Sequence, residues 1–199
     1  MDPIDLATLV AFHQSHQEKP TSAGKAGWSS EEAQQLRFTI LERLGDWEDA
    51  SILDVGCGLG DFWKFISARY QPTIYKGVDI LPNFISQAQE LNKDEERVTF
   101  SCGDYMQQDL LAMDYVVACG ALSYPTSVPD HPYSAIGRLW SLCNKGLGFN
   151  LLKTQKTDRE RYLRTYHPEE VMEFCQGISP KTEMIDSYSP DDFTVLMHR

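Results

Sequence analysis

The sequence predicts an α/β fold with a mostly parallel seven-stranded sheet and helices on both faces. Three observations lead to this prediction. Short apolar runs alternate with stretches of helical period along most of the chain. A glycine-rich turn, "GCGLG", directly follows the first apolar run. Two β-rich runs close the chain around "PDD", which predicts a hairpin that makes one edge of the sheet antiparallel.

The N-terminal region, residues 1–45, is expected to form a helical lid on a single core domain, residues 46–199. Apolar residues and a histidine recur at helical spacing over residues 5–17: Leu6, Leu9, Val10 and His13. The polar segment "EKPTSAGKAGW" is expected to be a loop that can move. Ser29 or Ser30 can then cap a helix to about residue 44, since Glu32 follows Ser29 by three places, as in a capping box.

Strands and helices alternate along most of the core. The predicted strands are, in order, "ASILDVG", "TIYKGVDI", "RVTFSCGD", "MDYVVACGAL", "GLGFNLLK", "KTEMIDSYS" and "DFTVLMHR". The predicted helices run from Asp61 to Tyr70, from Pro82, over residues 133–143 and from Pro168. Proline is tolerated in the first turn of a helix, which supports the second and the fourth of these starts.

Composition limits the class of protein. A chain of 199 residues suits one domain with a sizeable core. No apolar run is long enough to cross a membrane, and the N-terminus lacks signal-peptide features, so we expect a cytoplasmic protein. The formal charge of −11 disfavours a nucleic-acid partner, because an acidic surface repels phosphates. The five cysteines form no CxxC pair, which argues against a disulfide framework or a metal site.

The glycine-rich turn restricts the ligand. Its glycines are Gly56, Gly58 and Gly60, and they allow close approach of the backbone to a ligand. A dinucleotide fingerprint beginning at Gly56 would need glycine or alanine at position 61, where this chain has Asp61. No Gly-Lys-Ser/Thr follows, which excludes a Walker A loop. An acid just ahead of the glycines, Asp54, suits a ligand that carries an ammonium group.

The motifs around this turn resemble those of class I S-adenosylmethionine-dependent methyltransferases. "LDVGCGLG" is similar to their first motif, "GVDI" to the second, "CGDY" to the third and "ACGAL" to the segment that ends the fourth strand. The resemblance spans residues 28–199 and implies a Rossmann-like methyltransferase fold. It is specific because four motifs occur in order, each at the end of the appropriate strand.

The resemblance also implies roles for individual residues. Asp79 would hold the ribose hydroxyls, Asp104 would reach the adenine amine, and Tyr105 would flank the ring. Trp28 and Arg37 lie in a segment that closes over the cofactor in many small methyltransferases, and Arg37 could pair with its carboxylate. The full predicted cofactor set is Trp28, Arg37, Asp54, Gly56, Cys57, Gly58, Gly60, Asp79, Ile80, Asp104, Tyr105, Cys119 and Gly120.

The resemblance thus predicts an enzyme of class 2.1.1 that transfers a methyl group from S-adenosyl-L-methionine by in-line displacement. We expect a small-molecule acceptor, because no nucleic-acid-type Asn/Asp-Pro-Pro-Tyr/Phe motif is present and the loops after strands four and five are short. Tyr124 and His131 are the predicted catalytic residues. Other acceptor-side candidates are His13, His16, Ser123, Asp130, Tyr162, Tyr166 and His167.

Two alternatives remain open on the sequence. A protein of this fold could bind the cofactor as a sensor or interaction module without turnover, since no acceptor-side motif is clear. It could instead methylate a protein, because an acidic surface could attract a basic tail. A partner subunit could help to wall the pocket, but nothing in the sequence establishes an oligomer.

Overall fold

A computed structural model describes residues 1–154 and 163–199. The predicted candidate Tyr162 lies outside these residues. The described helices are α1 (Pro3–Gln14), α2 (Ser22–Lys25), α3 (Glu31–Glu42), α4 (Asp61–Ser67), α5 (Pro82–Leu91), α6 (Tyr133–Ser141) and α7 (Pro168–Ile178). The strands are β1 (Ser51–Val55), β2 (Ile74–Asp79), β3 (Val98–Cys102), β4 (Met113–Ala118), β5 (Cys143–Lys153), β6 (Thr165–Tyr166), β7 (Thr182–Ile185) and β8 (Asp192–His198).

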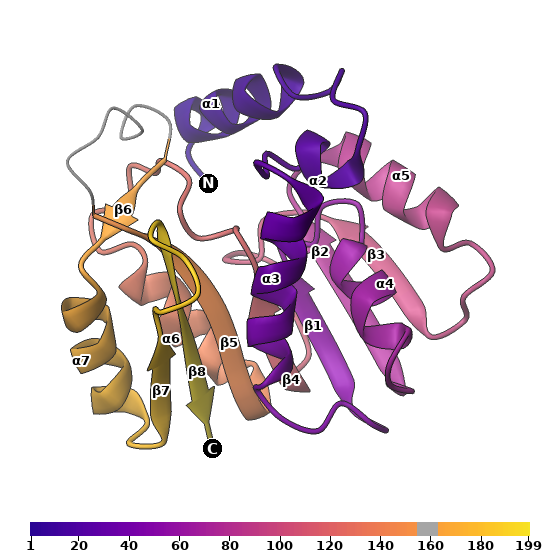
Figure 1. Cartoon of the computed structure of the whole chain (residues 1–199). Helices are drawn as coiled ribbons and strands as arrows, with labels where there is room; N and C mark the ends of the chain where they lie inside the picture. Colours follow the sequence, from indigo (N-terminus) through magenta and orange to yellow (C-terminus); the bar gives the residue numbers. More distant parts are fainter. Residues whose placement is uncertain (155–162) are drawn as a thin grey trace.

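One mixed sheet organises the molecule, with strand order β3-β2-β1-β4-β5-β8-β7 and the short β6 paired to β5 (Figure 1). Strands β1 to β5 are parallel to one another, whereas β8 is antiparallel to both of its neighbours. The order reverses between β1 and β4, so the chain leaves their carboxyl ends in opposite directions and opens a crevice there. The predicted α/β class, the seven main strands and the antiparallel C-terminal hairpin are confirmed.

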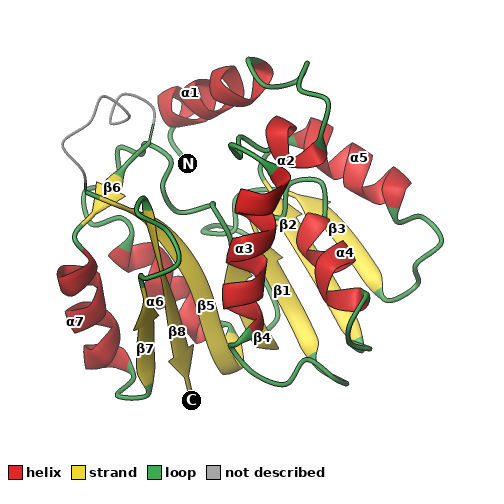
Figure 2. Ribbon diagram, viewed as in Figure 1, coloured by secondary structure: helices red, strands yellow, loops and turns green. Residues whose placement is uncertain are grey.

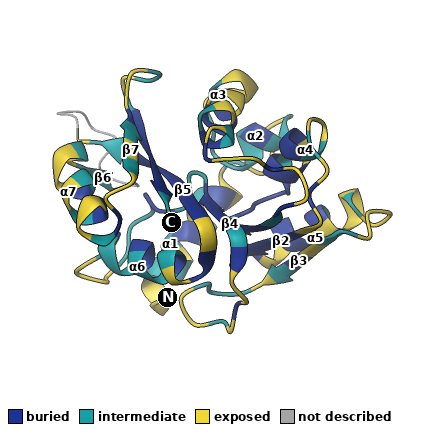
Figure 3. Cartoon of the chain, turned by 90° about the horizontal axis from the view of Figure 1, so that it is seen from below, coloured by how far each residue is buried: buried dark blue, intermediate teal, exposed yellow. Residues whose placement is uncertain are grey.

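Helices cover both faces of the sheet (Figure 2). Buried side chains of α3, α4 and α5 pack with Ile52 and Tyr75 into one core cluster. Side chains of α6 and α7 pack with Leu53 and Val116 into the other cluster. Successive residues of β1 thus face opposite layers, as the two-residue period of a strand requires. Viewed from below, the strands are buried along the middle and the exposed residues lie mainly on the outer helices and loops (Figure 3).

The N-terminal helices lie at the ligand-binding side of the sheet. Figure 1 shows α1 above the carboxyl ends of the central strands. Asp2 caps α1 by accepting from the Ile4 N–H, and Ser30 caps α3 by accepting from the Ala33 N–H at 3.1 Å. The second of the two predicted caps, Ser30, is therefore the one used. No helix in the described part of the chain is both long and apolar enough to cross a membrane.

Candidate functional site

A cavity of about 280 Å³ lies at the carboxyl ends of β1, β2 and β4. Its floor is the turn after β1, its sides are the segments that follow β2, β3 and β4, and α1 contributes to its roof. More of its wall is apolar than polar. This position, at the topological switch of a parallel sheet, is where such folds bind their ligands.

The turn after β1 is shaped by positive backbone angles. Gly56, Gly58 and Gly60 have φ values of 71°, 54° and 81°, which L side chains rarely adopt. A Cβ atom on Gly56 or Gly60 would collide with Ala121 or Phe100, respectively. A Cβ on Gly58 would meet no atom within 4 Å, so the open side of this glycine faces free space. The turn therefore presents bare backbone to a ligand.

Asp79 joins this turn to the end of β2. Its Oδ2 atom accepts from the Gly58 N–H at 2.9 Å and its Oδ1 atom accepts from the Leu81 N–H at 2.9 Å. Burial raises the pKa of Asp79, although hydrogen bonds from Leu81 and Gly58 oppose the shift. Each carboxylate oxygen keeps a second lone pair, so the group can still accept hydrogen bonds from a bound hydroxyl.

Asp54 is the second buried acid of the cavity. It lies on β1 and is only 2% exposed, and its Oδ2 atom accepts from the Tyr75 hydroxyl. Burial raises the pKa of Asp54 to about 7, although the Tyr75 hydrogen bond opposes the shift and nearby Asp79 adds to it. A cation bound beside Asp54 would favour its charged form. The site thus has an acid whose charge depends on the ligand.

The segment after β3 supplies Asp104 and Tyr105. The Oδ1 atom of Asp104 accepts from the Met106 N–H at 2.9 Å, and its Oδ2 atom contacts the N-terminal amine of Met1. The Asp104 carboxylate therefore lies at the cavity with an oxygen that can accept from an amine, as its predicted role requires. Burial raises the pKa of the Tyr105 hydroxyl, which stays protonated at neutral pH.

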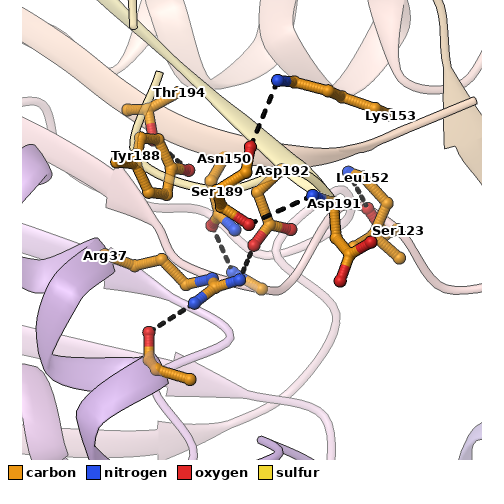
Figure 4. A network of polar contacts seen from close by, with 12 residues as sticks. Arg37, Ser123, Asn150, Leu152, Lys153, Tyr188, Ser189, Asp191, Asp192 and Thr194 are labelled. Atoms are coloured by element: carbon orange, nitrogen blue, oxygen red, sulfur yellow. Dashed lines mark hydrogen bonds and ion pairs between the residues drawn. The ribbon is translucent and has the colours of Figure 1, made fainter. Parts of the chain in front are cut away.

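Arg37 has a different partner from the predicted one. Its guanidinium pairs with Asp192 of β8 in a buried ion pair, and its Nη1 donates to the Ala33 carbonyl (Figure 4). The Trp28 ring lies 5.1 Å from the guanidinium carbon. Arg37 does not line the cavity, because its helix turns the side chain toward the C-terminal strand. A contact with a cofactor carboxylate would require it to leave Asp192, and that contact stays a prediction.

Gly120, at the end of β4, is fixed from two sides. Its N–H donates to the Asn150 side-chain oxygen at 2.7 Å (Figure 4). A Cβ atom here would lie 2.7 Å from the Trp28 ring, and the φ of 71° also favours glycine. Trp28 therefore packs against the backbone at the end of β4 and closes that side of the cavity.

Aromatic side chains join α1 to the rest of the cavity wall. The His13 ring centroid lies 5.0 Å from that of Phe84 and 5.4 Å from that of Tyr124. The His13 Nδ1 atom lies 3.4 Å from the Lys25 carbonyl oxygen, and burial lowers the pKa of His13 to about 4. His13 is therefore neutral at physiological pH. Asp5 holds the other end of α1, where it accepts from both the N–H and the hydroxyl of Ser127.

His131 lies in the opposite wall, after β4. Its Nδ1 atom lies 3.1 Å from the Tyr166 hydroxyl. Burial and the nearby Arg164 cation lower the pKa of His131 to about 4, although Asp130 opposes the shift. His131 and the predicted Tyr124 both line the cavity, so the structure brings the two catalytic candidates to one site.

The structure gathers nearly all residues of the predicted cofactor set, and both predicted catalytic residues, around this one cavity. Those that line it are Trp28, Asp54, Gly56, Cys57, Gly58, Asp79, Ile80, Asp104, Tyr105, Cys119, Gly120, Tyr124 and His131. Arg37 and Gly60 do not: Arg37 pairs with Asp192, and Gly60 precedes α4 with Phe100 packed against it. Of the other acceptor-side candidates in the described part of the chain, His13 lines it, whereas His16, Ser123, Asp130, Tyr166 and His167 do not. The functional roles assigned to these residues stay predictions.

Several lining residues were not in the predicted set. They include Leu9, Gln34, Phe38, Asp61, Leu81, Phe84 and Val128. The signal for Asp61 was present in the sequence, because it directly follows the last glycine of the turn. Its Oδ2 atom accepts from the Ser22 hydroxyl and from the Gln34 amide, so Asp61 fastens α2 and α3 to the glycine turn. Among the residues with described positions, no cluster of His, Cys, Asp and Glu suits a metal ion.

Comparison with known proteins identifies a methyltransferase domain. A family model described as a methyltransferase domain matches residues 52–146, which include the glycine turn and the segments after β2, β3 and β4. These residues form a class I S-adenosylmethionine-dependent methyltransferase domain. A Mycobacterium tuberculosis protein named as a methyltransferase is 24% identical to this chain over 157 residues, 75% of the chain and 93% of that protein.

A second relative shares only the core. The tRNA U34 carboxymethyltransferase of Pasteurella multocida is 32% identical over 97 residues, 46% of this chain and 30% of that enzyme. The methyltransferase described here thus spans less than a third of that relative.

Solved structures of methyltransferases share this fold over nearly the whole chain. The magnesium protoporphyrin IX methyltransferase of Synechocystis, with bound S-adenosylmethionine, superposes with a TM-score of 0.71 at 15% identity. The alignment covers 100% of this chain and 98% of that one. A Burkholderia thailandensis N-methyltransferase, with bound 1,6-didemethyltoxoflavin and S-adenosylhomocysteine, gives a TM-score of 0.69 at 17% identity over 98% and 87% of the two chains.

Proposed function

We propose that this methyltransferase transfers a methyl group from S-adenosylmethionine to a small-molecule acceptor. The observation that carries the proposal is that one cavity joins the glycine turn and two buried acids to a wall containing His13, Tyr124 and His131. The residues proposed to bind the cofactor and the side chains that could accept a proton thus line the same cavity. The acidic surface charge also favours a small acceptor over a nucleic acid.

The residues present fit S-adenosylmethionine. The open side of Gly58 leaves room for a ligand against the backbone. Asp79 can accept from the ribose hydroxyls through its free lone pairs, and Asp54 can pair with the ammonium group. Asp104 would exchange its contact with the Met1 amine for one with the adenine amine. Tyr105 and Trp28 supply flat surfaces beside these positions.

The chain's own residues then have a modest chemical task. When bound, S-adenosylmethionine supplies an electrophilic methyl group on a sulfonium that leaves as a neutral thioether. The protein has to hold the acceptor atom in line with that methyl group and keep water away. Phe84, Leu9 and Val128 provide an apolar wall for this purpose. A neutral His131 can take a proton from an acceptor hydroxyl or amine.

Relatives of the same fold support a small acceptor. The Burkholderia neighbour is an N-methyltransferase crystallised with its small heterocyclic compound, and the Synechocystis neighbour methylates a porphyrin. In the present chain α1 contributes Leu9 and His13 to the cavity, and its Asp5 is held by Ser127 of the segment after β4. A cavity roofed in part by a helix suits a compact acceptor better than a folded protein.

Two experiments test the proposal. Calorimetry with S-adenosylmethionine, S-adenosylhomocysteine and NAD should show binding of the first two only, and NAD binding alone would refute the cofactor assignment. Cell extracts incubated with the protein and methyl-labelled cofactor are then separated into small molecules and macromolecules. Label in the small-molecule fraction is expected. Label only on protein, or none despite cofactor binding, would refute the small-molecule reaction and favour the protein-methylating or the sensor alternative.

A further inference from the structure

The segment after β4, residues 119–131, is fastened to the neighbouring strands by polar contacts. The Gly120 N–H donates to Asn150 at 2.7 Å, and the Ser123 hydroxyl accepts from the Leu152 N–H at 3.2 Å (Figure 4). A third contact comes from β6, where the Tyr166 hydroxyl donates to the Leu122 carbonyl at 3.2 Å. Of these contacts, only the one made by Tyr166 also reaches a titratable side chain of the cavity.

Tyr166 lies between that carbonyl and His131. Its hydroxyl oxygen is 3.1 Å from the His131 Nδ1 atom and 3.2 Å from the Leu122 oxygen. Burial raises the pKa of Tyr166 to about 12, although the nearby Arg164 cation opposes the shift. Tyr166 is therefore a neutral hydroxyl with one proton to donate.

The Leu122 carbonyl decides where that proton goes. A carbonyl oxygen can only accept, so the contact exists only when Tyr166 donates its proton to Leu122. The Tyr166 oxygen then offers only lone pairs to the imidazole. A hydrogen bond between the two rings consequently requires His131 to carry its proton on Nδ1. In that tautomer the Nε2 atom has no proton and an available lone pair.

The Nε2 lone pair is not used elsewhere in the described part of the protein, where His131 makes no hydrogen bond through that atom. The imidazole itself belongs to the cavity wall. An imidazole without such a partner favours the opposite tautomer, with the proton on Nε2. The arrangement of Leu122, Tyr166 and His131 thus opposes the intrinsic preference of the ring.

We propose that Tyr166 is a positioning residue. Because it donates its proton to the Leu122 carbonyl, it can only accept from His131, and this holds the His131 proton on Nδ1 and presents an unprotonated Nε2 to the methyl acceptor. This inference rests on the proposed function. The acceptor X–H would lose its proton to Nε2 as the X–C bond forms, the methyl–sulfur bond breaks with its electron pair on sulfur, and His131 becomes an imidazolium. The acceptor class implied is a hydroxyl or an N–H compound, which must lose a proton on methylation.

The tautomer of His131 can be measured without cofactor or acceptor. The full-length protein, with ¹⁵N-labelled histidine, is studied by long-range ¹H–¹⁵N correlation at pH 7.5, and the His131 signals are assigned from their loss in His131→Gln. We expect Nε2 in the range of an unprotonated ring nitrogen and Nδ1 in that of a protonated one. In Tyr166→Phe we expect the two ranges to exchange, in full or in part.

The controls separate this inference from the proposed function. Tyr188→Phe removes a hydroxyl bonded to Thr194 at 2.8 Å, in a different part of the protein, and should leave the His131 signals unchanged. Protonation of Nε2 in the wild type would overturn the proposal, whether or not Tyr166→Phe folds. An unchanged tautomer in folded Tyr166→Phe would also overturn it. Failure to bind S-adenosylmethionine would refute the proposed function while leaving the tautomer measurement valid.

Discussion

The Oδ2 atom of Asp79 lies 2.9 Å from the backbone nitrogen of Gly58 and accepts its hydrogen bond. This contact ties the end of β2 to the turn after β1, so the acid that is predicted to hold the ribose also sets the shape of the glycine turn. A substitution that removes the Asp79 carboxylate therefore removes both the predicted ribose contact and the hydrogen bond that shapes the glycine turn.

Asp79→Ala should weaken S-adenosylhomocysteine binding by about 1–3 kcal/mol, because the ribose hydroxyls lose an acceptor and the turn loses its anchor. Isothermal titration calorimetry measures the loss directly. Asp94→Ala, at an exposed position away from the cavity, is the matched control and should bind as the wild type does. Equal affinities of the wild type and Asp79→Ala would show that Asp79 is not the ribose acid.

Gly58→Ala should reduce cofactor affinity more than stability. The backbone strain at a φ of 54° costs about 1–2 kcal/mol, and the new methyl group enters the free space where the ligand is proposed to lie. Gly177→Ala is the matched control, since Gly177 lies in α7 with no atom near its Cβ position. That variant should be slightly more stable and bind normally. Thermal denaturation measures the stability of both variants, and calorimetry measures their cofactor affinity. Normal binding by Gly58→Ala would contradict the proposed position of the cofactor against Gly58.

Binding of the cofactor should release protons near pH 6 to 7. Asp54 has a pKa of about 7 in the free protein, and an ammonium group beside it would lower that pKa. His13 and His131, with pKa values of about 4, do not titrate in this window. Calorimetry in buffers of different ionisation enthalpy counts the protons. Asp54→Asn should abolish the release, and an identical release from the variant would rule out Asp54 as the source.

The same acid should affect stability in the absence of ligand. Because the pKa of Asp54 is raised on folding, its contribution to stability is fully present below pH 4 and is lost as the pH rises toward 7. Asp54→Asn should therefore lose less stability than the wild type between pH 5 and pH 8. Denaturant unfolding at the two pH values measures this difference. Equal losses of unfolding free energy in the two proteins would contradict a raised pKa of Asp54.

The ion pair of Arg37 and Asp192 should respond strongly to removal of one partner. Arg37→Met or Asp192→Leu alone leaves a buried charge and should cost about 3–5 kcal/mol of unfolding free energy. The double variant should recover much of this loss, because an apolar pair leaves no unpaired charge. Denaturant unfolding of the four proteins completes the cycle, and additive losses would show that the pair is not coupled.

The sequence predicted the fold well because its local signals agree with one another. Every main strand and helix was expected close to its observed position, since the hydrophobic periods, the prolines at 82 and 168 and the glycine turn all favour the same elements. Helix α2, only four residues long, was expected to be part of a loop, because a turn of that length leaves no periodic pattern. Strand β6 has two residues and was missed for the same reason.

The site was predictable where it is built from the ends of consecutive strands. The contributions of Leu9 and Phe84 depend on how α1 and α5 pack over those ends, which motif spacing does not specify. Arg37 shows what the sequence does not reveal. The family resemblance suggested a contact with the cofactor carboxylate, which stays a prediction, and the structure adds an ion pair with Asp192 of β8. Nothing in the local sequence of either residue signals that pairing.

Strand β8 follows β7 in the sequence, yet it lies inside the sheet between β5 and β7. During synthesis this gap must stay open until Asp192–His198 have left the ribosome. Until then β5 has an unpaired edge and Arg37 has no carboxylate to meet. The sheet is therefore completed only after β8 has been synthesised, and until then the nascent chain exposes a strand edge of the kind that promotes aggregation.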